Sequence, residues 1–117
     1  MYWKKSKRAK ACEFNSKERE AIFERDRGRC IICGSASSLT FAHYIPRSAG
    51  GLGIRQNGAL ICLKCHHEID NGAHTNLRKS YKAFFKSYLN LHYPNFSDEE
   101  RKYKKNGINP RIKSKSK

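Results

Sequence analysis

The sequence predicts one small α+β domain, and three observations support this fold class. The chain has 117 residues, of which 38% are hydrophobic, so it can form one core, and a thin one. Helical patterns surround a segment rich in strand-forming residues and a second, short apolar segment. Four of the five cysteines stand in two Cys-x-x-Cys pairs. A thin core is often supplemented by a structural metal ion, and paired thiolates are suited to holding one.

The first expected helix covers residues 16–27. Asn15 followed three residues later by Glu18 is a capping-box pattern, in which each side chain hydrogen-bonds the backbone N–H of the other residue. Charged residues surround Ile22 and Phe23, so these two side chains are expected to face the core.

The middle of the chain is expected to contain a strand, a turn and a short helix. Residues 39–45 are rich in strand-forming side chains, and a Gly-Gly pair at residues 50–51 favours a turn. Residues 60–63 form the short apolar segment that leads into the second cysteine pair. One or two helical turns are expected over residues 65–71, ending at Gly72.

The longest expected helix covers residues 75–93. Its apolar and aromatic residues recur at steps of three and four, which predicts a core-facing stripe rather than a base-stacking surface. The stripe consists of Leu77, Tyr81, Phe84, Tyr88 and Leu91, with Phe85 and Leu89 beside it. Ser97 and Glu100 form a second capping-box pattern, which is expected to open a short helix ending at Gly107.

The charge of the chain favours a polyanionic partner. The formal net charge is +15 and the pI about 9.9, an excess that fits nucleic acid. A tail that only keeps the chain soluble, or a basic helix at a membrane surface, are the alternatives.

We expect a basic arm over residues 1–14, a domain over 15–93 and a short helix with a basic tail over 94–117. No apolar run approaches the roughly 20 residues of a membrane helix, and no hydrophobic stretch follows the basic N-terminus. A reducing, cytoplasmic setting is therefore expected.

The paired cysteines predict a structural zinc site. In Cys30-x-x-Cys33 and Cys62-x-x-Cys65, the two-residue gap lets both sulfurs of a pair face one ion, and two pairs complete a tetrahedron. Sulfur would fill every position, so no place for a reactive water remains. Disulfide or redox chemistry is the alternative, which a cytoplasmic setting and the lack of a thioredoxin-like context disfavour. Cys12 is expected to be a free thiol.

The residues between and after the cysteine pairs resemble the HNH endonuclease family. The family pattern is a Cys-x-x-Cys pair, His-x-x-Pro, Gly-Gly, an Asn, and a Cys-x-x-Cys-His five residues after that Asn. The matching positions are Cys30, Cys33, His43, Pro46, Gly50, Gly51, Asn57, Cys62, Cys65 and His66. The resemblance covers residues 16–70 and implies the ββα-metal (His-Me finger) fold with flanking helices. Residues from 75 onward lie outside it.

The resemblance assigns roles to three of these residues. It implies that His43 is the general base, which suits a side chain that is neutral near pH 7. Asn57 would orient the His43 segment or contact the metal, and His66 would bind a catalytic divalent ion such as Mg²⁺, Mn²⁺, Ni²⁺ or Zn²⁺. The alternatives are a structural His43, a turn-forming Asn57 and a surface His66.

One position departs from the family pattern. Many relatives have an Asp, Glu or His directly before the general base, where it binds the catalytic metal, and this chain has Ala42. Asp70 is the candidate replacement, because it follows His66 by four residues on the same helix face. A solvated Asp70 is the alternative. His67 ranks second as a ligand, and His74 and His92 are expected to be ordinary polar residues.

The function that this resemblance implies is metal-dependent hydrolysis of DNA phosphodiester bonds, leaving 5′-phosphate and 3′-hydroxyl ends. Arg47, Arg55, Lys64 and the basic ends are expected to neutralise phosphates of double-stranded DNA, with little sequence specificity. A non-catalytic, zinc-stapled DNA-binding module is the main alternative, and Ala42 favours it. An RNA-binding protein of the translation machinery is a weaker one. Small HNH proteins resemble those that phages and mobile elements carry in bacterial host cells, which makes packaging or mobile-element proteins candidate partners.

Overall fold

The computed structural model describes residues 6–71 and 75–105, and it confirms the α+β fold class. In chain order the elements are α1 (Lys7–Ala11), α2 (Ser16–Arg25), β1 (Leu39–His43), η1 (Arg47–Ala49), η2 (Arg55–Asn57), β2 (Gly58–Cys62), α3 (Leu63–Asn71), α4 (Thr75–His92) and η3 (Glu99–Arg101). The expected ends of helices at Gly72 and Gly107 lie outside the described residues.

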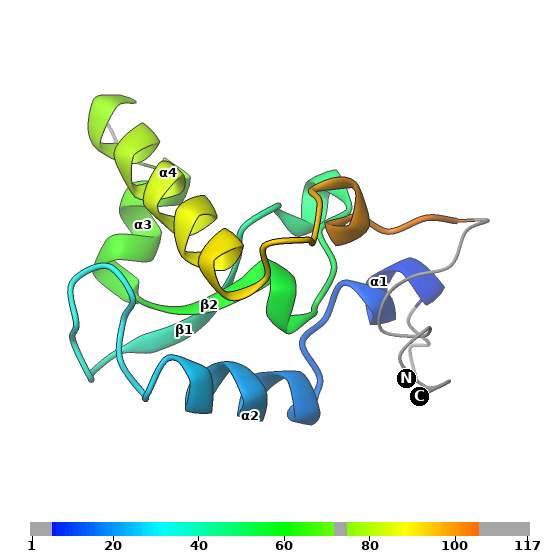
Figure 1. The fold of residues 1–117 in the computed structure, drawn as a ribbon, viewed down its shortest axis with the longest axis horizontal. Helices are drawn as coiled ribbons and strands as arrows, with labels where there is room; N and C mark the ends of the chain where they lie inside the picture. Colours follow the sequence, from blue (N-terminus) through cyan, green and yellow to red (C-terminus); the bar gives the residue numbers. More distant parts are fainter. Residues whose placement is uncertain (1–5, 72–74, 106–117) are drawn as a thin grey trace, which may run out of the picture.

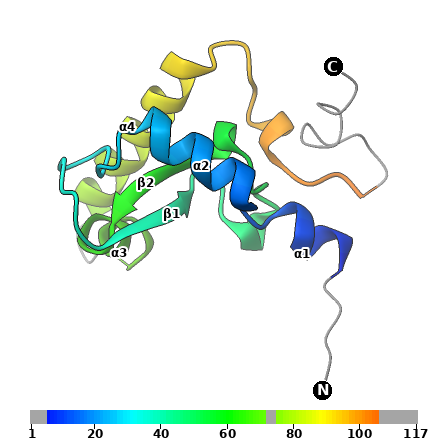
Figure 2. The same ribbon diagram turned by 90° about the horizontal axis from the view of Figure 1, so that it is seen from below.

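The two strands form an antiparallel sheet that lies between helices. Leu39 pairs with Cys62 at one end and His43 with Gly58 at the other. Figures 1 and 2 show α2 on one side of this sheet and α3 with α4 on the other. The strand that carries His43 is thereby enclosed by helices, and its last residue lies where the sheet ends.

Alternation along the strands divides the core into two clusters. Ala42, Ala59 and Ile61 pack with α3 and α4 in the larger cluster, together with Cys30, Cys62, Cys65, Ile69, Phe85 and Leu89. Leu60 points to the opposite face, where it packs with Phe14 and Ile22. Three of the four paired cysteines thus lie inside the larger core and Cys33 is exposed, so an ion bound among them would support packing as well as chain connectivity.

Helix α2 begins as expected but presents a narrower apolar face. The Asn15 side chain accepts a hydrogen bond from the backbone N–H of Glu18 at 2.9 Å, which confirms the cap. Ile22 is fully buried, whereas Phe23 is 51% exposed, so the expectation that Phe23 faces the core is wrong. The two side chains are neighbours in sequence and diverge by about 100° around the helix, so one line of contact with the sheet buries only one of them.

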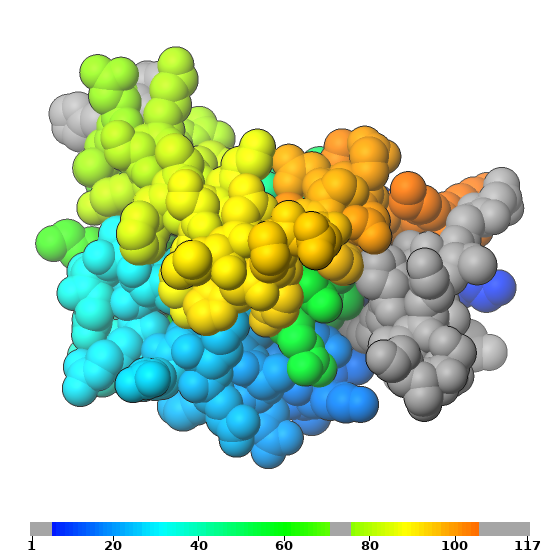
Figure 3. All heavy atoms as spheres, viewed as in Figure 1, coloured from blue at the N-terminus to red at the C-terminus, as the bar shows by residue number. Residues whose placement is uncertain are grey.

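Helix α4 buries only part of the predicted stripe, together with the two residues that were expected beside it. Phe85 and Leu89 are fully buried, and Tyr81 and Tyr88 pack beside them. Within the predicted stripe, Leu77, Phe84 and Leu91 are 36%, 46% and 77% exposed. The helix rests on α3 and on the loop of the first cysteine pair along one narrow line, and Figure 3 shows this part of α4 in yellow above the loop in cyan. The spacing identified the helix correctly, but its core stripe is centred about one position further along.

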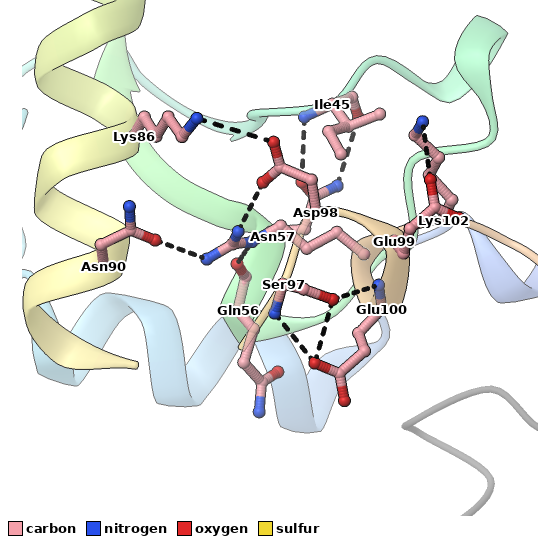
Figure 4. A network of polar contacts seen from close by, with 11 residues as sticks. Ile45, Gln56, Asn57, Lys86, Asn90, Ser97, Asp98, Glu99, Glu100 and Lys102 are labelled. Atoms are coloured by element: carbon pink, nitrogen blue, oxygen red, sulfur yellow. Dashed lines mark hydrogen bonds and ion pairs between the residues drawn. The ribbon is translucent and has the colours of Figure 1, made fainter. Parts of the chain in front are cut away.

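The segment after α4 is fastened to the loop that follows β1. Ser97 and Glu100 form the expected reciprocal cap, which Figure 4 shows, although only the single turn of η3 follows it. The backbone N–H of Leu52 donates to the carbonyl of Arg101, and that of Tyr103 donates to the carbonyl of Gly50. Gly51 also lets the loop fold tightly onto its own start, since a Cβ there would lie 1.6 Å from the Ile45 carbonyl oxygen.

Arg101 anchors this C-terminal segment from inside the molecule. Its side chain is 1% exposed and donates to the Gln56 carbonyl and to the Asp98 carboxylate at 2.6 and 2.7 Å. The guanidinium also lies over the Tyr44 ring at 5.8 Å. A buried cation needs such partners, because desolvation would otherwise disfavour it strongly. The contact with Tyr44 links the segment to the residue that follows His43.

Candidate metal centre and active site

Four cysteines converge on one point, as the sequence predicted. The sulfur atoms of Cys30, Cys33, Cys62 and Cys65 all lie within 4.8 Å of one another. Tetrahedral zinc with Zn–S bonds of about 2.3 Å places its sulfurs about 3.8 Å apart, and Cys33 and Cys62 are separated by 3.6 Å. The donor set and spacing therefore fit a zinc ion, and the cluster can hold one.

The first cysteine pair is preorganised by its own loop. Backbone N–H groups of Ile32 and Cys33 point at the Cys30 sulfur at 3.4 and 3.5 Å. Burial acts to raise the pKa of Cys30, but backbone N–H groups of Cys33, Cys62 and Ile32 outweigh it and lower this pKa to about 7. Burial and the neighbouring thiols raise the pKa of Cys65. Deprotonated sulfurs this close together repel one another, and a cation bound among them would remove this repulsion.

A cleft opens beside the end of β1 and gathers most of the expected active-site residues. Its volume is about 510 Å³. Its lining consists of His43, Tyr44, Pro46, Arg47, Ser48, His66, Ile69, Asp70, Arg78 and Lys82. The strand end, the η1 turn, α3 and α4 all contribute, so residues far apart in sequence meet here. Three histidine and carboxylate side chains and three cations share this one hollow.

His43 is oriented by residues that precede α2. Its Nε2 lies 2.7 Å from the carbonyl oxygen of Cys12, and because a carbonyl only accepts, Nε2 carries the hydrogen. In the neutral ring, Nδ1 is then the atom that can accept a proton. The Phe14 ring lies 4.3 Å from the imidazole, centroid to centroid, and limits its rotation.

Burial lowers the pKa of His43 below its usual 6.5. The Cys12 carbonyl opposes this change, and the positive charges of Arg47 and His66 add to it. The imidazole is therefore neutral at pH 7, as a proton acceptor has to be.

His66 faces Asp70 across one helical turn. The Thr40 hydroxyl donates its only hydrogen to the Ile61 carbonyl at 2.6 Å, so it accepts from Nδ1 of His66 at 2.8 Å. The remaining nitrogen, Nε2, lies 3.1 Å from a carboxylate oxygen of Asp70. A neutral ring would turn a lone pair toward this anion, so the arrangement calls for a proton or a metal ion between the two atoms.

Asn57 lies behind the cleft and does not line it. The side chain is fully buried, and its oxygen accepts from the Ile45 N–H at 2.9 Å. Its nitrogen donates to the carbonyls of Ile45 and Leu52 at 3.2 and 2.9 Å (Figure 4 shows the Ile45 pair). These bonds tie the exit of the His43 strand to the loop that returns to β2. The geometry suits a positioning residue.

Ala42 points into the core instead of the cleft. It is 2% exposed and packs in the cluster that contains Ile69 and Phe85. Of the other histidines, His67 is exposed on α3 and His92 lies against Tyr88 on α4; neither lines the cleft. His74 lies outside the described residues.

Two of the three cations expected to meet phosphates are placed elsewhere. The Arg55 side chain pairs with the Glu18 carboxylate at 3.1 Å, and Lys64 is exposed away from the cleft. Only Arg47 lines it. Sequence reasoning missed Arg78 and Lys82, which α4 contributes from the other side, because cations on the polar face of an amphipathic helix normally indicate solvent.

The family model of the HNH endonucleases matches residues 30–72. This segment contains both cysteine pairs together with His43, Asn57, His66 and Asp70. Residues 30–72 form an HNH domain. Helices α1, α2 and α4 lie outside the matched residues.

A solved structure with a similar fold is the type IV phosphorothioation-dependent restriction endonuclease ScoMcrA. The TM-score is 0.52 and the sequence identity 20%, over 70% of this chain and 18% of that enzyme. The likeness concerns the fold, and the chain spans less than a fifth of the enzyme's length. No curated protein matches the sequence significantly. Among the described residues, no helix is both long and apolar enough to span a membrane.

Proposed function

We propose that this HNH domain is a metal-dependent endonuclease that hydrolyses DNA phosphodiester bonds. The observation that carries the proposal is the cleft, in which His43 lies with the His66–Asp70 pair and three cations. HNH family membership of residues 30–72 supports nuclease chemistry at the level of the family. The net charge of +15 supports a polyanionic substrate.

His43 acts as the general base in this proposal. The Cys12 carbonyl holds the hydrogen on Nε2, so that Nδ1 accepts the proton of the attacking water. Phe14 limits the rotation of the ring, and Asn57 holds the strand end from which it projects. The lowered pKa keeps the base unprotonated at neutral pH.

His66 and Asp70 would hold the catalytic ion. Their facing atoms are 3.1 Å apart, close to the roughly 3 Å between adjacent ligands of an octahedral ion with bonds of about 2.1 Å. The Thr40 hydroxyl fixes the tautomer of His66 that leaves Nε2 open for coordination. A bound divalent ion supplies positive charge to the phosphate and to the departing oxygen. Asp70 thereby replaces the ligand that Ala42 does not provide.

A zinc-stapled DNA-binding module without catalysis is the second candidate function. The burial of Ala42 in the apolar core favours it, because the strand supplies no metal ligand at that position. Two protein ligands hold an ion more weakly than three, so in this candidate function the affinity for a catalytic ion is too low for the site to be occupied. The two functions differ in one measurable outcome, which is cleavage.

A plasmid-cleavage assay tests the proposal. The zinc-loaded protein is incubated with supercoiled plasmid and Mg²⁺, Mn²⁺, Ni²⁺ or Zn²⁺, beside His43→Ala and the control His67→Ala. We expect nicking or linearisation with at least one metal, a loss of roughly 10²- to 10⁴-fold in His43→Ala, and no loss in the control. Circular dichroism and zinc content show whether each variant is folded. Equal cutting by His43→Ala would contradict the assigned base.

The same assay examines the metal ligands. Asp70→Ala should raise the metal concentration needed for half-maximal cleavage, whereas Asp70→His, which keeps a ligand at this step, should restore part of it. Calorimetry with Mn²⁺ measures the affinity independently of cleavage. Unchanged affinity in Asp70→Ala would remove Asp70 from the site. Duplex binding without cleavage in any metal would favour the second candidate.

A further inference from the structure

Helix α4 forms a wall of the cleft although it lies outside the matched HNH segment. Arg78 and Lys82 line the same hollow as His66 and Asp70 of α3, while Arg47 lines it from the η1 turn. The buried residues Phe85 and Leu89 hold α4 against α3 and so determine where these cations lie. The cleft therefore has cations on two different elements, with the HNH residues in the same hollow.

Within the described residues, no carboxylate forms an ion pair with the three cations of this cleft. Arg47, Arg78 and Lys82 form no ion pair with any carboxylate in residues 6–71 and 75–105, although other cations of the chain do. Lys86, one turn further along α4, is already paired with Asp98. Arg78 and Lys82 are four residues apart, so both project from one side of the helix. Unpaired cations that share one cleft attract a polyanion that is long enough to contact several of them.

The form of the hollow favours the backbone of duplex DNA over a single strand. Proteins that bind single strands offer exposed aromatic rings on which bases stack. Among the lining residues that the structure describes, the only tyrosine is Tyr44, and its ring packs edge-on against Phe85 at 5.5 Å and under the Arg101 guanidinium at 5.8 Å. The cleft thus offers charged side chains, which suit the backbone phosphates of a duplex in which the bases remain paired.

We infer that the Arg78–Lys82 side of α4 is a DNA clamp, which binds the sugar–phosphate backbone of double-stranded DNA opposite Arg47. The inference rests on the proposed function, whose cleft it shares, and adds a binding role for a helix outside the HNH match. The cations would hold the phosphates next to the scissile one. Their contribution is electrostatic, so it is independent of base sequence and falls with salt concentration.

Equilibrium binding of the full chain to a labelled duplex tests the clamp. Fluorescence anisotropy is measured in the His43→Ala background, over a series of KCl concentrations, so that cleavage does not disturb the signal. Arg78→Gln with Lys82→Gln should weaken binding roughly tenfold near physiological salt and reduce the slope of log K against log salt by about two. Arg78→Lys should retain most of the affinity, because it keeps the charge.

The matched control is Lys17→Gln with Lys79→Gln, which removes the same total charge from exposed positions outside the cleft. Equal weakening in this control would overturn the clamp, as would a clamp variant that loses affinity for RNA or single-stranded DNA but not for the duplex. Zinc content confirms that every variant is folded. If the clamp variant alone loses duplex affinity while the wild-type chain never cuts plasmid, the clamp stands and the catalytic proposal fails.

Discussion

At the scale of single residues, the chemistry of His43 is controlled from outside its own strand. The Cys12 carbonyl assigns the tautomer, and Phe14 limits rotation of the ring. Asn57 fastens the strand end through two hydrogen bonds to Ile45 and ties it to the following loop through a third, to Leu52. The first two contacts come from the segment before α2, which was expected to be part of a basic arm. This segment is therefore placed to support the proposed active site.

The pH dependence of cleavage follows from the surroundings of His43. Burial first, and then Arg47 and His66, lower its pKa below 6.5, so the acidic limb of kcat/KM should lie below pH 6.5. Arg47→Gln removes a positive charge and should move this limb to higher pH, by roughly half a unit or less because Arg47 is exposed and screened. Lys17→Gln should leave it in place. A limb above pH 6.5, or a shift to lower pH in Arg47→Gln, contradicts the assignment.

At the scale of elements, α4 is held by a narrow line of contact. Phe85 and Leu89 are buried between Tyr44, α3 and the loop of the first cysteine pair, while Phe84 and Leu91 remain largely exposed. Because the helix also carries Arg78 and Lys82, this packing decides where the cations of the cleft lie. The stability of the chain and the proposed binding of DNA therefore depend on the same element.

Two phenylalanine variants on α4 measure this line of contact. Phe85→Ala removes a fully buried ring and should lower the free energy of unfolding by about 3–5 kcal/mol, because it leaves a cavity. Phe84→Ala, one position along, removes a ring that is 46% exposed and should cost less than about 1 kcal/mol. Urea unfolding of the zinc-loaded protein provides the comparison. Similar losses in both variants would show that the burial assigned to α4 is wrong.

At the scale of the whole molecule, the four cysteines join the loop before β1 to the junction of β2 and α3. Three of them, Cys30, Cys62 and Cys65, lie within the larger core cluster, so an ion there would support both its packing and the position of His66, which follows Cys65 directly. Structural zinc binding contributes about 10–16 kcal/mol in small domains, which is as large as the total stability of a typical domain. The fold is therefore expected to depend on the ion.

Removal of zinc should unfold the chain. Cys62→Ser, or a strong chelator, should abolish the stoichiometric zinc and the cooperative thermal transition seen by circular dichroism. Cys12→Ser is the matched control, because Cys12 is buried but outside the sulfur cluster, and it should keep both the zinc and the transition. A chelated protein that still melts cooperatively near the temperature of the zinc form would show that the core suffices without the ion.

The sequence by itself determined the features that depend on residues a few positions apart. These include the Asn15 cap, the Ser97–Glu100 cap, the two cysteine pairs, and the placing of Asp70 one turn after His66. It also predicted the match of residues 30–72 to the HNH endonuclease family, because the order and spacing of the motifs can be read without knowing which residues are in contact. The catalytic roles of His43, Asn57 and His66 stay predictions that the cleft supports.

Only the tertiary structure decided which faces and which distant groups meet. It turned Phe85 inward rather than Phe84, paired Arg55 with Glu18, and brought the Cys12 carbonyl to His43. It also placed cations of α4 in the cleft beside residues of α3. The physical reason is that local backbone geometry follows from neighbouring side chains, whereas the cleft and the contacts that orient its residues join segments far apart in the sequence, such as Cys12 and His43 at a separation of 31.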